Sequence, residues 1–261
     1  MLIVLSPAKN LNFDSIPHAP KPTKPRLLKD TAELADVTRN LTKSKLKSLM
    51  GISDALAELN FERFQAFRTS GKISGTKSAA FAFNGDVYWG LEAKTLSTED
   101  LEFAQRHLRI LSGLYGVLRP LDAIQPYRLE MGSRLKNSRG ANLYEFWNDR
   151  IAIELRKATK TDEDKTIVNL ASKEYFSAVD RSILKAPVIA PVFKEEKDGK
   201  LRSLQFFAKR ARGAMARWAI QQRIERAADL KAYNVDGYAF QPSLSDDETW
   251  IFTRPQPPKK S

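Results

Sequence analysis

Short runs of consecutive apolar residues constrain the fold of this chain more than any other feature. Leu2–Leu5 is entirely apolar and is followed at once by Ser6 and Pro7, and Thr166–Leu170 is largely apolar and is followed by a polar cluster. A strand buried on both faces has such a run, whereas a strand with one solvent-exposed face alternates apolar and polar residues. The two runs therefore predict buried strands of a sheet that helices cover.

The segment 108–135 joins a core sequence to charged residues. Its first half is rich in apolar residues and glycine, and it ends at Pro120, which stops regular structure because proline lacks a backbone donor. In 127–134 charged and apolar residues alternate, so in an extended chain Arg128 and Glu130 share one face and the apolar residues between them share the other. We expect this segment to hold opposed charges at the edge of the core.

Helical and hairpin patterns fill the rest of the chain. The expected helices cover 31–40, 41–50, 54–60, 97–111, 143–158 and 208–226. Turn signals such as Asn84-Gly85-Asp86 and Asp198-Gly199 predict hairpins that pair 79–83 with 87–89, 187–193 with 201–207, and 237–240 with 249–253. The sequence has no internal repeat and no long linker. The expected fold is a single compact α/β domain (mixed α+β) over 1–253, with a mixed β-sheet flanked by helices, followed by a disordered Pro/Lys tail at 254–261.

The composition excludes several classes of protein. Hydrophobic residues make up 42% of the 261 residues, enough for a sizeable core, but no run approaches the roughly 20 apolar residues of a membrane helix. There is no cysteine, and hence no disulfide, thiolate nucleophile or iron–sulfur ligand. The N-terminus lacks the basic leader of a signal peptide. We expect a monomer in the reducing cytoplasm, with no membrane partner and no cofactor.

The charge is strongly positive and unevenly distributed. The net charge is +12, which favours polyanionic partners because neutralising phosphates releases counterions. Residues 202–226 hold seven basic residues and one acidic residue, a net charge of +6 and half of the total. Apolar residues such as Met215 supply a docking side for the helix expected here. Its arginines Arg210, Arg212 and Arg217 would then line a groove or a solvated face.

The segment 42–60 resembles a helix-hairpin-helix module. Gly51, Ile52 and Ala57 match the usual Gly-apolar-Gly core and the alanine that follows it, and Ser53 replaces the second glycine. Such a module holds DNA phosphates with backbone N–H groups and carries little sequence information. The alternative is a helical hairpin that only packs on the core. The basic residues of the first helix that are close enough to assist are Lys43, Lys45 and Lys47.

Long literal strings resemble the YaaA peroxide-stress protein family. They are MLIVLSPAK at 1–9, LSGLYGVLRPLD at 111–122, QPYRLEMG at 125–132, NLAS and EYF within 169–176, and AKRARGAMARW at 208–218. The match is colinear over nearly the whole chain. The resemblance implies a cytoplasmic peroxide-stress protein that limits damage to DNA and proteins when iron drives hydroxyl radical formation. It also implies direct, largely sequence-independent binding to double-stranded or branched DNA, including junctions and distorted duplexes.

Net charge, the hairpin and the basic segment together predict a DNA-binding surface in two parts. Backbone N–H groups at 51–53 would hold one phosphate region, and a basic cleft would hold another. The residues assigned to this surface are Lys43, Lys45, Lys47, Gly51, Ile52, Ser53, Lys9, Arg128, Arg134, Lys209, Arg210 and Arg212.

The alternative is an enzyme that acts on a nucleotide or another phosphorylated small molecule. Polar residues follow the predicted strand ends, and a group mixing Glu with Lys, Arg and Tyr can supply a general acid or base. The residues of this group are Ser6, Lys9, Arg128, Glu130, Arg134, Lys173, Tyr175 and Arg212, with Lys9, Glu130, Lys173 and Tyr175 as the catalytic candidates. We favour a different role for Glu130, as the ion-pair partner that orients Arg128 or Arg134.

Two further classes have no support in the sequence. An iron-binding protein would need cysteines, paired histidines or Glu-x-x-His motifs, whereas the chain has no cysteine and two histidines. A serine hydrolase would need a Gly-x-Ser-x-Gly elbow, which is absent. No metal ligand is therefore assigned.

Overall fold

The computed structural model describes residues 1–16, 20–71 and 73–258, and its fold is built on one mixed sheet. The strand order is β11-β12-β9-β8-β1-β5-β6, and β10 pairs with β9. Strands β12, β9, β8, β1 and β5 are parallel, whereas β6, β10 and β11 run antiparallel to their neighbours. The strands span Leu2–Leu5 (β1), Leu108–Ser112 (β5), Gly116–Leu118 (β6), Ile167–Leu170 (β8), Val188–Lys197 (β9), Lys200–Arg202 (β10), Ala239–Phe240 (β11) and Thr249–Pro255 (β12).

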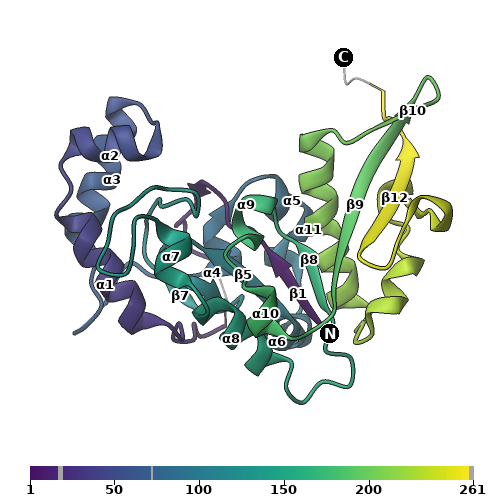
Figure 1. The fold of residues 1–261 in the computed structure, drawn as a ribbon, viewed down its shortest axis with the longest axis horizontal. Coiled ribbons are helices and arrows are strands. Elements are labelled where there is room, and N and C mark those ends of the chain that lie inside the picture. Colours follow the sequence, from purple (N-terminus) through teal and green to yellow (C-terminus); the bar gives the residue numbers. More distant parts are fainter. Residues whose placement is uncertain (17–19, 72, 259–261) are drawn as a thin grey trace.

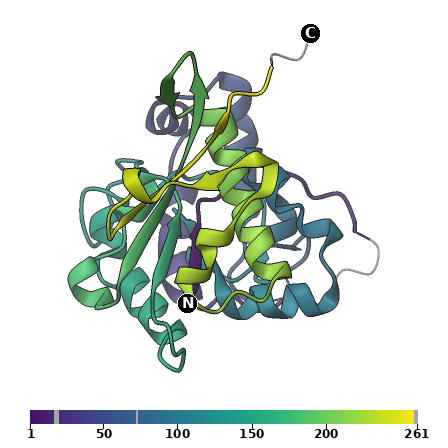
Figure 2. The same ribbon diagram turned by 90° about the vertical axis from the view of Figure 1, so that its right-hand side faces the viewer.

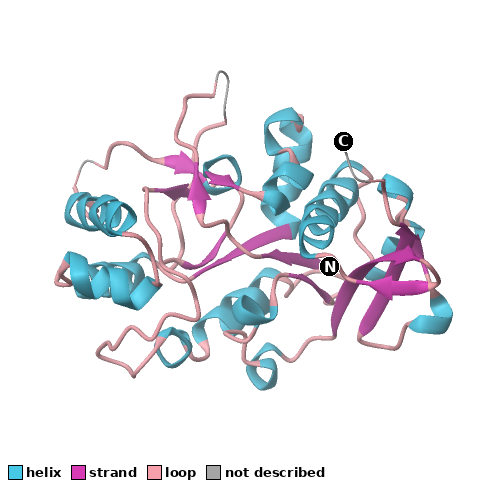
Figure 3. Ribbon diagram, turned by 90° about the horizontal axis from the view of Figure 1, so that it is seen from above, coloured by secondary structure: helices cyan, strands magenta, loops and turns pink. Residues whose placement is uncertain are grey.

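Helices cover both faces of this sheet, which confirms the expected mixed α/β fold (Figure 3). Helices α5, α6 and α11 lie on one side, and α8, α9 and α10 lie on the other (Figure 2). None of the described helices is long and apolar enough to cross a membrane. The helices span Leu28–Arg39 (α1), Lys43–Met50 (α2), Asp54–Ala66 (α3), Ala79–Ala82 (α4), Asp86–Leu91 (α5), Thr98–His107 (α6), Leu143–Trp147 (α7), Arg150–Ala158 (α8), Lys173–Phe176 (α9), Arg181–Leu184 (α10) and Gln205–Gln221 (α11).

Strand β1 lies in the middle of the sheet and is buried along its whole length. It pairs in parallel with β5 on one side and with β8 on the other. The chain passes from β1 toward β5 but from β8 toward β9, so the connections diverge between these two neighbours. In open α/β sheets, ligands bind outside the carboxyl ends of the strands at such a point. Ser6 follows β1 here, and Ser172 lies two residues beyond β8.

Two hairpins extend beyond the carboxyl edge of the sheet at opposite ends of the molecule (Figure 1). One is the helical hairpin α2–α3, and the other is the β9–β10 hairpin, which lies beside the start of α11. The second hairpin turns at Asp198 and Gly199, whose φ angles are 53° and 69°. The polar residues that follow β1 and β8 therefore lie between the two hairpins.

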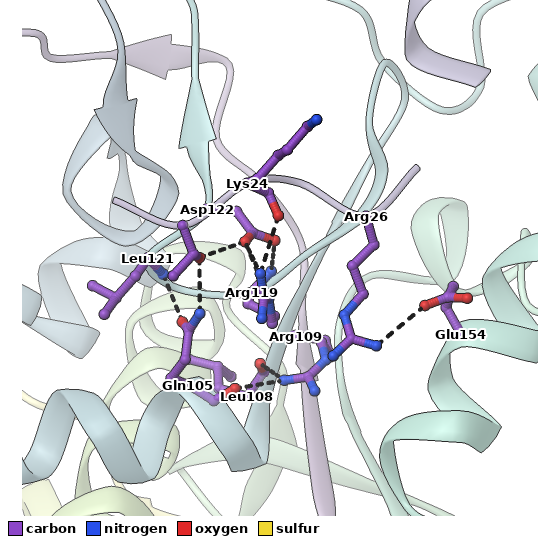
Figure 4. Close-up of polar contacts among 10 residues, drawn as sticks. Lys24, Arg26, Gln105, Leu108, Arg109, Arg119, Leu121, Asp122 and Glu154 are labelled. Carbon is purple, nitrogen blue, oxygen red and sulfur yellow. Dashed lines mark hydrogen bonds and ion pairs between the residues drawn. The ribbon is translucent and has the colours of Figure 1, made fainter. Parts of the chain in front are cut away.

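Arg119 fixes the covering segment before α1 to the core (Figure 4). Its guanidinium donates to Asp122 Oδ1 at 2.8 Å and to the carbonyl of Lys24 at 3.0 Å, and Thr23 Oγ1 donates to the same Asp122 oxygen at 2.6 Å. Pro120 sits in this turn, so the expected end of regular structure after β6 is confirmed.

Arg109 of β5 is a buried cation that the sequence does not single out (Figure 4). Its Nη1 donates to the carbonyls of Gln105, Arg106 and Leu108, at 3.0, 3.2 and 2.7 Å. These carbonyls end α6, where a cation is favourable. Burial lowers the pKa of Arg109 to about 10, and nearby Arg26 and Arg119 add to the effect. The side chain therefore has a structural role.

The hairpin expected over 79–89 is wrong. Ala79–Ala82 is helical because its alanine-rich sequence favours a helix, and a second helix begins at Asp86. Between them, Phe83–Asn84 forms β4, which pairs with Asn10–Leu11 (β2) instead of with 87–89. A second small sheet pairs Lys77–Ser78 (β3) with Ala123–Ile124 (β7).

Two expected helices have wrong boundaries. The helix that begins after the capping-box residue Ser97 ends at His107, so the apolar residues at 108 and 111 belong to strand β5. Over short spans, apolar residues three or four apart fit a helix face and a buried strand alike. The helix expected at 143–158 is broken at Asn148, which has a φ of 42°, a conformation that a continuous helix excludes.

Two expectations near the C-terminus need similar corrections. The turn at Asp198 is confirmed, but β10 ends at Arg202 and α11 begins at Gln205, so the expected strand 201–207 is mostly wrong. Strand β12 continues to Pro255, and the N–H of the next residue donates to the Glu196 carbonyl at 2.8 Å. The tail expected to be disordered therefore begins inside the sheet, and its residues 259–261 lie outside the described part of the chain.

Helices α5 and α11 pack backbone to backbone at two glycines. A Cβ atom on Gly213 would lie 1.8 Å from the carbonyl oxygen of Val87, and one on Gly90 would lie 2.1 Å from the carbonyl oxygen of Arg210. No side chain fits at either distance, so only glycine permits this crossing. The contact fixes the rotation of α11 and hence the direction in which each of its arginines points.

We expect Gly213→Ala to destabilise the protein by about 3 kcal/mol, because the added methyl group forces the two helices apart. Helix propensity alone would give the opposite sign, a gain of up to about 1 kcal/mol. Urea unfolding followed by circular dichroism measures the difference. Lys209→Ala, an exposed position of the same helix, is the control and should change stability by less than about 0.5 kcal/mol. Unchanged or higher stability of Gly213→Ala would contradict the packing described.

Candidate functional site

Two serines join the carboxyl ends of β1 and β8. Ser6 Oγ accepts the N–H of Ser172 at 2.8 Å and donates to Ser172 Oγ at 3.3 Å. Ser172 in turn is the N-cap of α9 and accepts the N–H of Tyr175. The Tyr88 hydroxyl donates to the carbonyl of Ser6 at 3.0 Å. These contacts tie together the carboxyl ends of β1 and β8, where the connections diverge, beneath the charged groups around Glu130.

Glu130 is the centre of a compact charge cluster at this edge. Its Oε2 contacts Lys9 Nζ at 2.9 Å, and its Oε1 contacts Arg128 Nη2 at 3.0 Å. The alternation predicted over 127–134 is confirmed, because the apolar side chains of this segment are buried whereas Arg128 and Glu130 are partly exposed. Glu130 thus pairs with Arg128 as we favoured, and its second partner is Lys9. Arg134 is exposed and forms no ion pair in the described part of the chain.

Three tyrosines lie buried beneath the cluster. Tyr88, Tyr127 and Tyr175 are at most 8% exposed. Burial raises the pKa of all three phenols above their ordinary value, and nearby acidic groups add to the effect at Tyr175. Tyr127 OH and Ser112 Oγ share a hydrogen bond of 2.6 Å. A neutral buried phenol is a hydrogen-bond donor, so Tyr175 is a poor candidate for a base at neutral pH.

Helix α3 contributes a cation to the same edge. Arg63 is close enough to Arg128 that mutual repulsion, after burial, lowers the pKa of Arg63. Its Nη1 donates to Asn60 Oδ1 at 3.4 Å. The helical hairpin is therefore electrostatically connected to the cluster around Glu130.

Lys173 and Arg212 lie apart from that cluster, in a neighbouring pocket of about 410 Å³. We call it the Arg212 pocket. Its walls come from the end of β8, from α9, β9 and α11. The residues that line it are Asn169, Ala171, Lys173, Phe176, Ser177, Val179, Arg181, Ala190, Pro191, Val192 and Arg212.

The other basic residues of α11 face elsewhere. Arg210 lines a cavity of about 490 Å³ together with Trp89, and Arg217 donates to the carbonyls of Leu91 and Glu92 at 3.2 and 3.0 Å. Residues 210 and 212 are about 200° apart around a helix. Of the two alternatives for Arg210, Arg212 and Arg217, a groove or a solvated face, a groove shared by all three is therefore wrong, since only Arg212 lines the pocket beside β8.

The helical hairpin has the backbone geometry expected of it. Helix α2 ends at Gly51, whose φ of 60° and ψ of 45° place it in the left-handed region that favours glycine. Ile52 is 8% exposed and anchors the loop in the core. Ser53 caps α3 by accepting the N–H of Leu56 at 3.4 Å. The expected pair of helices around 51–53 is confirmed.

The three lysines of this hairpin differ in their partners. Lys43 pairs with Glu58 across the hairpin, and Lys47 pairs with Asp54 at 2.8 Å. Lys45 is exposed, and none of the ion pairs found among the described residues involves it. Only Lys45 therefore offers an uncompensated charge.

A family model described as peroxide stress protein YaaA matches residues 1–244. The chain belongs to this family. It is 58% identical over 258 residues to a UPF0246 protein of Phenylobacterium zucineum (strain HLK1), which covers 99% of this chain and 96% of that protein. A UPF0246 protein of Maricaulis maris (strain MCS10) is 57% identical over 257 residues, 98% of this chain and 97% of that protein. One from Ralstonia pickettii (strain 12J) is 52% identical over 254 residues, 97% of this chain and 99% of that protein.

Sequence reasoning missed several residues of this YaaA-family site. The sequence could have indicated Ser172, because it follows a buried strand as Ser6 does. No sequence pattern indicates Asn169 or Arg63, since an asparagine in a strand and an arginine in a helix are both common. Among residues 1–16, 20–71 and 73–258, no cluster of three or more histidine or acidic side chains could hold a metal ion.

The buried phenols of this YaaA-family chain predict alkaline instability. Their pKa values lie above the unfolded value of about 10, so the stability they confer is complete below pH 10 and is lost as pH rises beyond it. We expect tyrosinate absorbance and loss of ellipticity to rise together above about pH 10. Titration of most phenols while the fold stays intact would contradict the burial described.

Proposed function

We propose that this YaaA-family protein binds DNA by its sugar–phosphate backbone in the cytoplasm and limits iron-driven radical damage to DNA and proteins during peroxide stress. Junctions and distorted duplexes are included among its targets. The observation that carries the proposal is the placement of two hairpins beyond the carboxyl edge of the sheet (Figure 1). One is a helical hairpin with open N–H groups, and the other is a β-hairpin whose cations form no ion pair with the described residues.

The helical hairpin supplies the first phosphate contact. The N–H groups of Ser53, Asp54 and Ala55 have no acceptor within the described chain, because they precede the first full turn of α3. The α3 helix has 13 residues, and its dipole adds positive potential at this end. Backbone groups of this kind hold phosphates without reading bases, which fits sequence-independent binding.

The β9–β10 hairpin and the start of α11 supply the second contact. Their cations form no ion pair with any described residue. Of the three acidic residues of this hairpin, Glu195 is buried and hydrogen-bonded to Tyr238, whereas Glu196 and Asp198 are exposed. These cations are Lys194, Lys197, Lys200, Arg202 and Lys209. A DNA segment lying across the carboxyl edge of the sheet would contact both hairpins.

The enzymatic alternative has weaker support. Each oxygen of Glu130 contacts a cation, which is the arrangement of a carboxylate that orients Lys9 and Arg128. Lys173 lines the Arg212 pocket instead of joining Lys9 and Glu130. The four catalytic candidates therefore do not form one constellation, and the Lys9–Glu130–Arg128 group fits a role in shaping the surface.

Charge reversal at the two hairpins tests the proposal. We expect Lys45→Glu combined with Lys200→Glu to weaken binding to any duplex at least about tenfold and to lower the salt slope by about 2, because two phosphate contacts are lost. Fluorescence anisotropy across a salt series measures both quantities.

The matched control is Lys160→Glu combined with Lys165→Glu. These lysines precede β8 at the amino edge of the sheet, beside Asp162, Glu163 and Asp164, and their reversal changes the net charge by the same amount. Binding should stay within about twofold of the unmodified protein. If the two double variants weakened binding equally, net charge alone would govern binding, and the two-hairpin proposal would be contradicted.

The loop geometry gives an independent test. Gly51→Val should weaken binding to all sequences alike, because valine disfavours a φ of 60° and the loop must change shape. A Cβ at Gly51 meets no atom within 4 Å, so the core is not disturbed. Gly237→Val is the control, since Gly237 also has a positive φ and open space around it. Both variants should lose similar stability in urea, and retention of DNA affinity by Gly51→Val would contradict a role for the loop.

A further inference from the structure

The Arg212 pocket contains a cation that no acidic group neutralises. Arg212 forms no hydrogen bond or ion pair with any residue in the described ranges, although it is only partly exposed. Burial lowers the pKa of Arg212, with no carboxylate nearby to offset the effect. By contrast, Arg109 donates to three carbonyls and Arg128 donates to Glu130. A partly buried guanidinium without a partner destabilises the folded protein unless an anion binds to it.

The rest of the pocket lining favours an anion with an apolar body. None of the lining residues is acidic. Lys173 adds a second cation, and the charge of Arg181 is taken up by Glu248 at 2.8 Å. Asn169 accepts the N–H of Ala171 with Oδ1, which leaves its amide N–H groups available as donors. The remaining walls are largely apolar.

We propose that the Arg212 pocket binds a small phosphomonoester, with the phosphate between Arg212 and Lys173 and an apolar or planar group against Phe176 and Pro191. A guanidinium matches phosphate geometry with two parallel N–H donors. The volume of about 410 Å³ is within the usual range for small-molecule sites, about 300 to 1,000 Å³. This inference does not depend on DNA binding.

A free phosphomonoester fits this pocket better than a phosphate of a DNA strand. Arg212 is recessed between α9 and β9, whereas Lys209 and Arg210 of the same helix are exposed. A DNA duplex is stiff, so its phosphates contact the exposed cations of the surface first. A small phosphate ester, by contrast, can enter a half-enclosed pocket. A free phosphomonoester and a DNA phosphate present the same charged group to Arg212, and separate measurements of monophosphate binding and DNA binding distinguish them.

The test uses calorimetric titration of the full chain with inorganic phosphate, adenosine 5′-monophosphate and adenosine. We expect the monophosphate to bind with a Kd below about 1 mM and adenosine to bind at least about tenfold more weakly. Arg212→Gln should weaken monophosphate binding at least about tenfold, and Arg210→Gln, which faces another cavity, should leave it unchanged. Arg212→Lys should have an intermediate effect, because it keeps the charge without the two-donor geometry.

Thermal unfolding supplies a readout independent of heat of binding. Without ligand, Arg212→Gln should melt at the same or a higher temperature than the unmodified protein, because an unpaired charge has been removed. Adenosine monophosphate should raise the Tm of the unmodified protein and not that of Arg212→Gln.

Three results would overturn the proposal. The first is no binding of any phosphate compound at about 10 mM. The second is equal monophosphate binding by Arg212→Gln and the unmodified protein. The third is a loss of DNA affinity in Arg212→Gln as large as its loss of monophosphate affinity, which would assign the pocket to a DNA phosphate.

Discussion

Parallel pairing of β1 with two strands that are distant in sequence is the constraint on which this structure depends. Val4 lies opposite Arg109 on one side and Asn169 on the other, so a single buried strand sets the register of both halves of the sheet. Because parallel strands end at the same edge, this pairing brings Ser6 and Ser172 into contact. The two projecting hairpins lie at the edge thus created (Figure 1). The charge cluster around Glu130 and the Arg212 pocket lie at the same edge.

Electrostatics divides this edge into regions with different roles. Glu130 pairs with both Lys9 and Arg128 at the centre, so it offsets one of their two positive charges. Lys45 of α2 and the cations Lys197, Lys200 and Arg202 of the β9–β10 hairpin have no ion-pair partner among the described residues and are exposed to solvent. Arg212 also lacks a partner but is recessed. Exposed charges suit a polyanion, whereas a recessed charge suits a small anion.

Features set by local sequence could be predicted, and features set by packing could not. The apolar run of β1, the helix break at Gly51 and the Asp198 turn each depend on a few neighbouring residues, and each is confirmed. Alternation placed Arg128 and Glu130 on one face, and of the two partners considered for Glu130 the structure shows Arg128. The direction of Arg212 depends on the glycine contact between α5 and α11, and the lost hairpin at 79–89 depends on β2, which is far away in sequence. No local pattern encodes such contacts.

Amide hydrogen exchange with and without a DNA duplex tests binding across the carboxyl edge, because it reports which backbone groups the DNA covers. We expect slower exchange at 53–55, where the N–H groups are open, and at the β9–β10 hairpin, with no change at 160–165 on the amino edge. Protection at only one hairpin, or protection centred on 160–165, would contradict binding across the carboxyl edge of the sheet.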